Sequence, residues 1–194
     1  KKIFTLIAAM LLVPWVGWGQ ETITINTAEE LREFAEKVNN NTDEEASWDV
    51  VLGADINLGG EENPWTPIDN FKGTFDGGNH TISGLHIENI TDYAGLFGKV
   101  EDGSIKNLTI QGEIKNCTGN VGGFCGYGNT ATLINCHNEV DITVNGFSKV
   151  YDDAYIIQVG GVAGYSKTLE NCSNKGSITI NIPELDRTVL DQYY

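Results

Sequence analysis

The chain has 194 residues, which suits one domain and is short for two. Its 12 Lys and Arg residues stand against 27 Asp and Glu residues, and the formal net charge of −15 disfavours binding to nucleic-acid phosphates or to anionic lipid surfaces. Because 40% of the residues are apolar, the chain can bury a core and is not expected to be disordered. The 23 glycines are unusually many and favour a repetitive β-structure.

Residues 1–19 have the layout of a secretory signal peptide. Two lysines begin the chain, an apolar run covers residues 3–16, and Gly17 and Gly19 stand before a cleavage site at Gln20. The apolar run is shorter than the ~20 residues that span a bilayer, so we expect cleavage rather than a membrane anchor. The pattern resembles exported proteins of Gram-negative bacteria of the Bacteroidetes type. This implies a protein that is secreted, or placed in the periplasm or on the outer surface, with no membrane-spanning segment after cleavage.

Residues 20–47 are predicted to hold a short strand and an amphipathic capping helix. Thr27 and Glu30 fit a capping box, in which the threonine side chain accepts a hydrogen bond from the third helical amide and the glutamate reaches back. An apolar stripe follows at helical spacing: Leu31, Phe34, Ala35 and Val38. We expect this helix to cover the open end of a stacked sheet, whose unpaired edge would otherwise invite aggregation.

From residue 94 the chain repeats itself. The segment Gly95–Gly98 returns as Gly123–Gly126 and again as Gly161–Gly164. C-terminal to each copy, an asparagine stands at the equivalent position of the repeat: Asn107, Asn135 and Asn171. These asparagines recur after 28 residues (107 to 135) and then after 36 (135 to 171), and a strand with alternating apolar residues follows each of them.

Short strands, glycines at fixed positions and a repeat of this length predict a β-solenoid over residues 48–194. One turn of such a coil cannot bury its inner face alone, so successive turns stack ~4.8 Å apart and share a core. We expect Asn107, Asn135 and Asn171 to form a ladder at one corner, because Asn tolerates the left-handed backbone region. A β-sandwich is the alternative, but it does not require sequence recurrence at this spacing.

Three segments together carry a resemblance to a known family. They are Trp65–Ile68, Phe71–Leu85 and Ala94–Gly98, and they resemble the GLUG-motif repeat proteins. Members of that family are exported bacterial surface proteins, built as right-handed parallel β-helices of pectate-lyase-like architecture. The similarity covers roughly residues 48 to 182, although Cys125 and Ala163 stand where the first copy has Phe97. It implies an all-β, right-handed parallel β-helix with one N-terminal capping helix, and no catalytic residues.

The sequence contains no recognisable catalytic or metal-binding constellation. Pectin-cleaving hydrolases need clustered carboxylates, but Asp43 and Asp152–Asp153 lie far apart and lack the accompanying basic motif. A lyase needs acidic Ca²⁺ ligands beside a basic residue, and the only arginines are Arg32 and Arg187. The three histidines have no zinc-like spacing and are interpreted as surface or corner residues: His80, His86 and His137. No catalytic residue, metal or cofactor is therefore predicted.

Two cysteines occupy the same repeat position. Cys136 and Cys172 should stack near 4.8 Å, within the Cα range of a disulfide, and exported proteins can carry disulfides. The position is equally compatible with small, buried, reduced thiols, and Leu108 at the equivalent site one turn earlier favours simple packing. Both states remain open.

One insertion interrupts the repeat between Val144 and Val159. It carries aromatic and acidic residues that form a candidate binding set: Phe147, Tyr151, Asp152, Asp153 and Tyr155. Loops on a rigid scaffold often bind ligands, and tyrosines suit sugars or partner proteins. The alternative is a loop packed on itself.

These observations lead to one leading hypothesis for function. The chain is expected to be a non-enzymatic, exported scaffold for adhesion or for binding a glycan or protein ligand. Aligning Asn145 with Asn181 places the end of the chain where another glycine-rich strand would start, so further repeats or domains are expected to follow. The alternatives are a carbohydrate-active enzyme whose catalytic part lies outside this sequence, or a passive surface stalk.

Overall fold

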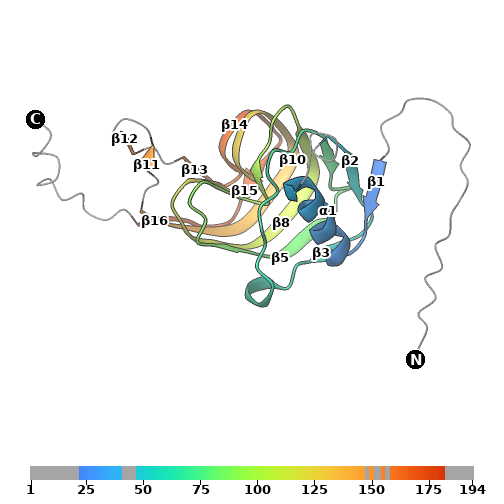
Figure 1. Ribbon diagram of the computed structural model, residues 1–194, viewed down its shortest axis with the longest axis horizontal. Coiled ribbons are helices and arrows are strands. Elements are labelled where there is room, and N and C mark those ends of the chain that lie inside the picture. Colours follow the sequence, from blue (N-terminus) through green and yellow to red (C-terminus); the bar gives the residue numbers. More distant parts are fainter. Residues whose placement is uncertain (1–21, 41–46, 147–148, 151–153, 156–157, 182–194) are drawn as a thin grey trace, which may run out of the picture.

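The computed structural model describes residues 22–40, 47–146, 149–150, 154–155 and 158–181 (Figure 1). These residues contain one α-helix, α1 (Ala28–Asn40), and one 3-10 turn, η1 (Gly60–Glu62). The strands are β1 (Thr22–Ile25), β2 (Asp49–Leu52), β3 (Ile56–Asn57), β4 (Thr74–Asp76), β5 (Thr81–Glu88), β6 (Tyr93–Ala94), β7 (Phe97–Lys99), β8 (Ser104–Cys117), β9 (Asn120–Gly122), β10 (Cys125–Asn145), β11 (Lys149–Val150), β12 (Ala154–Tyr155), β13 (Val159–Gly160), β14 (Ala163–Glu170), β15 (Ser173–Asn174) and β16 (Ile178–Asn181).

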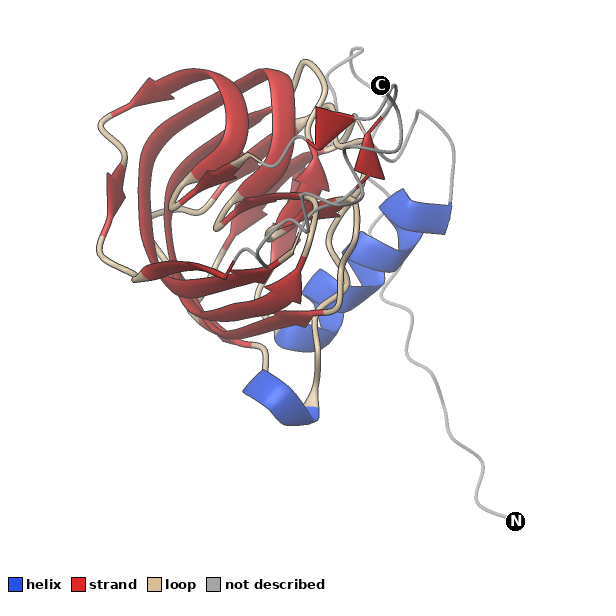
Figure 2. Cartoon of the chain, turned by 90° about the vertical axis from the view of Figure 1, so that its left-hand side faces the viewer, coloured by secondary structure: helices blue, strands red, loops and turns tan. Residues whose placement is uncertain are grey.

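The strands form a mostly parallel architecture. An 11-stranded sheet runs in the order β1-β2-β4-β8-β10-β14, with β3, β5, β7, β15 and β16 paired beside this path, and a second sheet has the order β13-β9-β6. The larger sheet curls into a half-barrel around a common core (Figure 2). The predicted all-β class with one helix is therefore confirmed in its coarse form.

Equivalent residues of the repeats lie in adjacent layers. In one column Phe97 pairs with Cys125, which also pairs with Ala163, so the Gly-bracketed segments run parallel and side by side. Between Gly128 and Thr132 the pairing of β10 with β14 shifts register, because the third copy is two residues shorter there (166 to 168 against 128 to 132). The shorter turn is absorbed as a bulge, and the layers regain register at the next residues.

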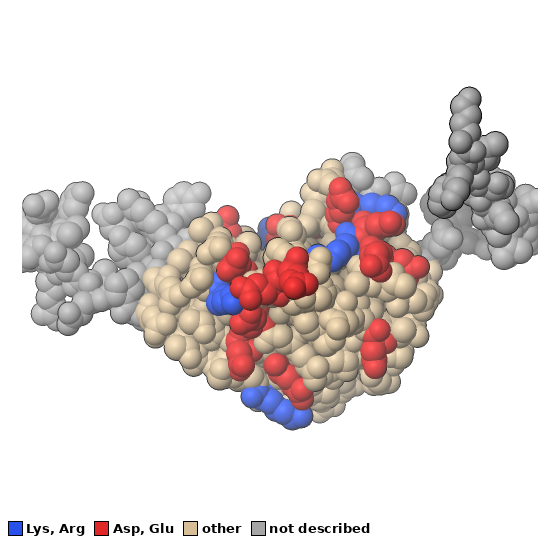
Figure 3. All heavy atoms as spheres, turned by 90° about the horizontal axis from the view of Figure 1, so that it is seen from below, with Lys and Arg blue, Asp and Glu red and all other residues tan. Residues whose placement is uncertain are grey.

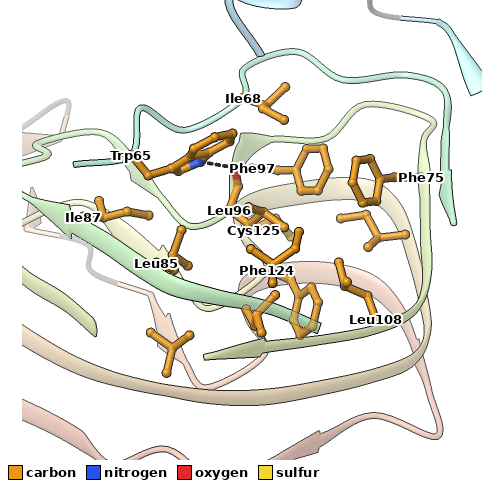
Figure 4. Close-up of a cluster of buried hydrophobic side chains, with 14 of the residues drawn as sticks. Trp65, Ile68, Phe75, Leu85, Ile87, Leu96, Phe97, Leu108, Phe124 and Cys125 are labelled. Carbon is orange, nitrogen blue, oxygen red and sulfur yellow. Dashed lines mark hydrogen bonds between the residues drawn. The ribbon is translucent and has the colours of Figure 1, made fainter. Parts of the chain in front are cut away.

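Aromatic rings fill the first layers of the core (Figure 4). The ring centroid of Phe97 lies 5.1 Å from that of Phe71 and 5.4 Å from that of Phe75, and all three side chains are fully buried. Trp65 is also buried, and its indole Nε1 donates a 2.9 Å hydrogen bond to the carbonyl of Leu96. The polar edge of the indole is thus satisfied inside an otherwise apolar cluster.

Helix α1 packs on this aromatic cluster. All four residues of its predicted apolar stripe are buried, and the ring of Phe34 lies 6.1 Å from that of Phe71. Thr27 Oγ1 accepts a 3.2 Å hydrogen bond from the N–H of Glu30, as a capping box requires. The Glu30 carboxylate reaches one residue further back than expected and accepts from the N–H of Asn26 at 2.7 Å.

The corners of the coil are marked by asparagines. Among the described residues, eight non-glycine residues have a positive φ: Asn70, Asn79, Asn89, Asp102, Asn107, Asn116, Asn135 and Asn171. Seven of these are Asn, the residue whose short amide best tolerates the left-handed region apart from glycine. The sharp turns between strands therefore depend on this residue type.

The last described layer has an open face. Leu169, Ile178 and Ile180 are 51%, 43% and 46% exposed. Their partners one layer earlier are fully buried: Leu133, Ile142 and Val144. Among the described strands, β14 and β16 in this sheet pair only with β10. Inward-facing positions are thus uncovered at this end, whereas α1 covers the other.

Candidate functional site

The predicted binding loop is largely outside the described residues. Phe147, Tyr151, Asp152 and Asp153 all fall there. The backbone of Tyr155 belongs to β12, which pairs antiparallel with β11 and places Tyr155 opposite Lys149. The candidate set is therefore not assembled into a site by the part of the chain that the structure describes.

The repeated asparagines lie on top of one another at a corner. Asn107, Asn135 and Asn171 have φ angles of 53°, 53° and 51°. The Asn135 side-chain amide donates to Asn107 Oδ1 at 2.9 Å, and that of Asn107 donates to Asp76 Oδ1 at 3.0 Å. The hydrogen-bonded ladder thus joins Asp76, Asn107 and Asn135 from layer to layer as a structural element, whereas no side-chain hydrogen bond links Asn171 to a described residue.

Cys136 and Cys172 are neighbours but are not bonded to each other. The residues that follow them, His137 and Ser173, are register partners in adjacent strands. All four cysteines are free, and the thiols of Cys136 and Cys172 each donate a 3.4 Å hydrogen bond to a backbone carbonyl of the preceding layer. Burial raises the pKa of Cys136, and the neighbouring Cys172 raises it further, so the thiol stays protonated and is a poor nucleophile.

One histidine is not where the sequence analysis placed it. His86 is only 1% exposed, and its Nδ1 lies 2.8 Å from Glu113 Oε1. The N–H of Trp65 donates to the carbonyl of His86 at 2.7 Å, so the segment around Trp65 covers this part of β5. The surface assignment is wrong for His86, because a chain segment distant in sequence packs against its strand.

The strongest candidate site is a groove that the sequence analysis did not predict. It has a volume of about 520 Å³ and lies between the loops of residues 66–70 and 89–93, beside β7. Its lining is Thr66, Pro67, Asp69, Asn70, Asn89, Ile90, Thr91, Asp92, Tyr93 and Lys99. Seven of these ten residues are polar or charged, so amide, hydroxyl and carboxylate groups predominate on this concave surface, and Pro67, Ile90 and Tyr93 add apolar surface.

Hydrogen bonds attach the first wall of this groove to the scaffold. Asn39, in the last turn of α1, donates from its side-chain amide to the carbonyl of Pro67 at 3.0 Å. The same side chain accepts from the N–H of Asp69 at 2.8 Å. On the other side of the loop, Gly98 donates from its N–H to the carbonyl of Ile68 at 2.8 Å. This loop is therefore held in place from both the helix and the sheet.

The second wall is held in the same way. The N–H of Thr118 donates to the carbonyl of Ile90 at 3.0 Å, and the N–H of Asn120 donates to the carbonyl of Asp92 at 2.8 Å. Two parallel register pairs then join β6 to β9, beginning with Tyr93 opposite Asn120. Both walls are thus preformed, so a ligand would pay little ordering entropy on entering the groove.

A stack of tyrosines supports the aromatic side of the groove. The ring centroids of Tyr93 and Tyr127 are 5.5 Å apart, and those of Tyr127 and Tyr165 are also 5.5 Å apart with nearly parallel planes. Tyr93 lines the groove, whereas Tyr165 ends the stack at the open layer, and their exposed fractions are similar at 36% and 40%. Tyr127 therefore holds the Tyr93 ring as a rigid wall.

Two unpaired carboxylates line the same groove as Tyr93. Within the described residues, the carboxylates of Asp69 and Asp92 form no hydrogen bond or ion pair. Burial raises the pKa of Asp69, and the charge of Asp92 raises it further against a smaller opposing effect of Lys99. Lys99 itself is ion-paired with Glu101 at 2.5 Å. The groove thus has an excess of negative charge. Asp and Glu also predominate over Lys and Arg on the face of the molecule shown in Figure 3.

The described residues contain no group of three or more His, Cys, Asp or Glu side chains arranged to hold a metal ion. They also contain no helix long and apolar enough to cross a membrane. Comparisons with protein-family models, curated proteins and solved structures find no match for this chain.

Part of this site had a signal in the sequence. Tyr127 and Tyr165 each follow the second glycine of a repeat, so extending the repeat alignment by one residue would have paired these two rings. The first copy has Lys99 at that position, so the alignment does not locate Tyr93. Residues 89–93 recur one layer later as residues 116–120, with Asn89 equivalent to Asn116. The position of this loop opposite residues 66–70 carries no sequence signal, because it arises only through the winding of the chain.

Proposed function

We propose that this chain is an exported, non-enzymatic scaffold that binds glycans in the groove beside Tyr93. The observation that carries the proposal is the combination of a supported aromatic wall with amide, hydroxyl and carboxylate groups on two preformed loops. Sugars present apolar ring faces and many hydroxyl groups, so a site for them needs an aromatic surface together with fixed hydrogen-bonding groups.

The scaffold in this proposal is a right-handed parallel β-helix. The support consists of the parallel register between repeat copies, the curled sheet and the resemblance to the GLUG-motif repeat proteins. An experimental structure in which the coil has the opposite hand would refute this part. The proposed export rests on the signal-peptide layout of residues 1–19, and it predicts a secreted chain that begins at Gln20.

A matched pair of tyrosine variants tests the binding site. Tyr93→Ala removes the aromatic wall, whereas Tyr165→Ala removes a similarly exposed ring from the same stack outside the groove. On a glycan array, the first variant should lose the signals of the unchanged protein and the second should keep them. Equal losses in both variants, or an unchanged Tyr93→Ala profile, would contradict a site in this groove.

One observation favours a second function, a glycoside hydrolase. Asp69 and Asp92 line the same groove, and a general acid in such an enzyme needs a raised pKa like that of Asp69. In that case Asp69 would protonate the leaving oxygen while Asp92 accepts a proton from the attacking water. Incubation with a bound oligosaccharide decides between the two functions. If the unchanged protein releases shorter sugars and the Asp69→Asn variant does not, the chain is an enzyme. If the oligosaccharide stays intact with the unchanged protein, the binding scaffold is favoured.

A further inference from the structure

We infer that the groove beside Tyr93 selects glycans that carry primary amino groups over neutral or acidic glycans of the same backbone. This inference rests on the proposed function and specifies the class of ligand. It is based on the charges that line the groove, on how the structure fixes them, and on the hydrogen-bonding groups between them.

The charges in the groove are unbalanced in one direction. The two carboxylates come from opposite walls, Asp69 from residues 66–70 and Asp92 from residues 89–93. Neither is paired within the described residues, whereas the one lining cation, Lys99, is already bound to Glu101. A ligand ammonium group between the walls would therefore meet attractive charge, and a uronic acid would meet repulsion.

Packing fixes the position of the Asp69 carboxylate. Its main-chain N–H is bound to Asn39, and its Oδ1 lies so close to Gly98 that a Cβ there would come within 2.2 Å. The glycine therefore makes room for the carboxylate against the sheet. Because the charge is already in place, a cationic ligand gains the interaction without first ordering the side chain.

A second hollow lies beside α1. It has a volume of about 320 Å³ and shares Thr66 with the first. Its charged lining residues are Arg32 and Glu36. Arg32 donates to three backbone carbonyls, whereas the Glu36 carboxylate has no partner within the described residues. Because carbonyl groups are neutral, Arg32 keeps its positive charge and balances Glu36 in this hollow, so the excess of negative charge lies in the groove beside Tyr93.

The remaining lining favours an amino sugar over a basic peptide. Asn70, Asn89 and Thr91 line the same groove and offer both hydrogen-bond donors and acceptors. A sugar ring can use these groups with its hydroxyls while it lies against Tyr93. A lysine side chain has an apolar stem and a single ammonium group, and it would leave these polar groups without partners.

Proton linkage gives the selection a pH dependence. Burial and the charge of Asp92 hold the pKa of Asp69 above its ordinary value of 3.8. A bound ammonium group favours the ionised form, so affinity for an amino glycan should fall as the pH drops through the pKa of Asp69. Affinity for the N-acetylated glycan, which carries no charge, should not follow this change.

Calorimetric titration of the full chain with glucosamine oligomers and N-acetylglucosamine oligomers of equal length tests the inference. The amino form should bind roughly 3- to 10-fold more tightly at low salt, as expected for one or two partly exposed ion pairs. The double variant Asp69→Asn and Asp92→Asn should abolish this preference and retain binding of the acetylated form. Glu170→Gln, which removes an exposed carboxylate on β14 outside the groove, should preserve it.

The outcomes separate the inference from the proposed function. Equal affinity for the two oligomers would overturn the amino-group preference and leave glycan binding intact. No binding to these oligomers or to any arrayed glycan would overturn the proposed function itself. Oligolysine that binds as tightly as the glucosamine oligomer, and equally well to Tyr93→Ala, would refute a sugar-specific site.

Discussion

Substitution of Asn135 tests how the corners of the coil are held. This residue combines a φ of 53° with a 2.9 Å hydrogen bond from its side chain to Asn107 Oδ1. Alanine has a Cβ but no polar side-chain group that could stabilise the left-handed conformation, so Asn135→Ala should cost ~1–2 kcal/mol through backbone strain. It also removes a hydrogen bond worth ~0.5–1.5 kcal/mol. We expect the free energy of unfolding to fall by about 2–3 kcal/mol.

Asn135→Gly separates the two contributions. Glycine adopts the left-handed region without strain, so this variant loses stability only through the missing hydrogen bond and through the greater conformational entropy of its unfolded chain. It should be about 1 kcal/mol more stable than Asn135→Ala. Asn171 has nearly the same φ, but no side-chain hydrogen bond links it to a described residue, so Asn171→Gly should change stability little.

Urea denaturation followed by circular dichroism measures all three variants. If Asn135→Ala and Asn135→Gly were equally destabilised, backbone conformation would not matter and the hydrogen-bond ladder alone would hold the corner. If Asn171→Gly cost as much as Asn135→Gly, the ladder bond would not contribute. Either result would show that backbone conformation and the side-chain hydrogen bond do not both contribute to the stability of this corner.

Three further predictions follow from single contacts. Burial raises the pKa of Asp76, but hydrogen bonds from the Gly78 N–H and the Asn107 amide lower it below 3.8. The folded protein should therefore lose stability as the pH falls through this lowered pKa. In acid unfolding, Asp76→Asn should reduce this pH-dependent loss of stability by ~0.5–1 kcal/mol. Cys172 is partly exposed, whereas the other three cysteines are buried. A maleimide should therefore label one thiol in the native protein and four after unfolding, as measured by mass spectrometry. Four labels in the native protein would contradict the burial of Cys117, Cys125 and Cys136. Gly98→Ala should displace the Asp69 carboxylate, whose Oδ1 lies where the new Cβ would stand, and reduce amino-glycan affinity in calorimetry; unchanged affinity would contradict a role for this carboxylate.

Much of the fold could be predicted because its signals are local or periodic. The spacing of the apolar residues located α1 and its buried face, since a helix presents every third or fourth residue to the same side. The glycine and asparagine repeats predicted which residues stack, since equivalent positions in a coil meet at the strand spacing. Helix, layers and corners therefore follow from patterns readable along the chain.

The site could not be predicted in this way. The groove beside Tyr93 depends on Asn39 from α1 holding the loop of residues 66–70, and on the loop of residues 89–93 being fixed by the next layer. The buried His86 shows the same dependence, since the segment around Trp65 covers its strand. The sequence by itself determined the layers and their turns, because each is fixed by a short-range pattern. Only the tertiary structure decided that the loops of residues 66–70 and 89–93 form the two walls of one groove, because no periodicity in the sequence relates these two loops to each other.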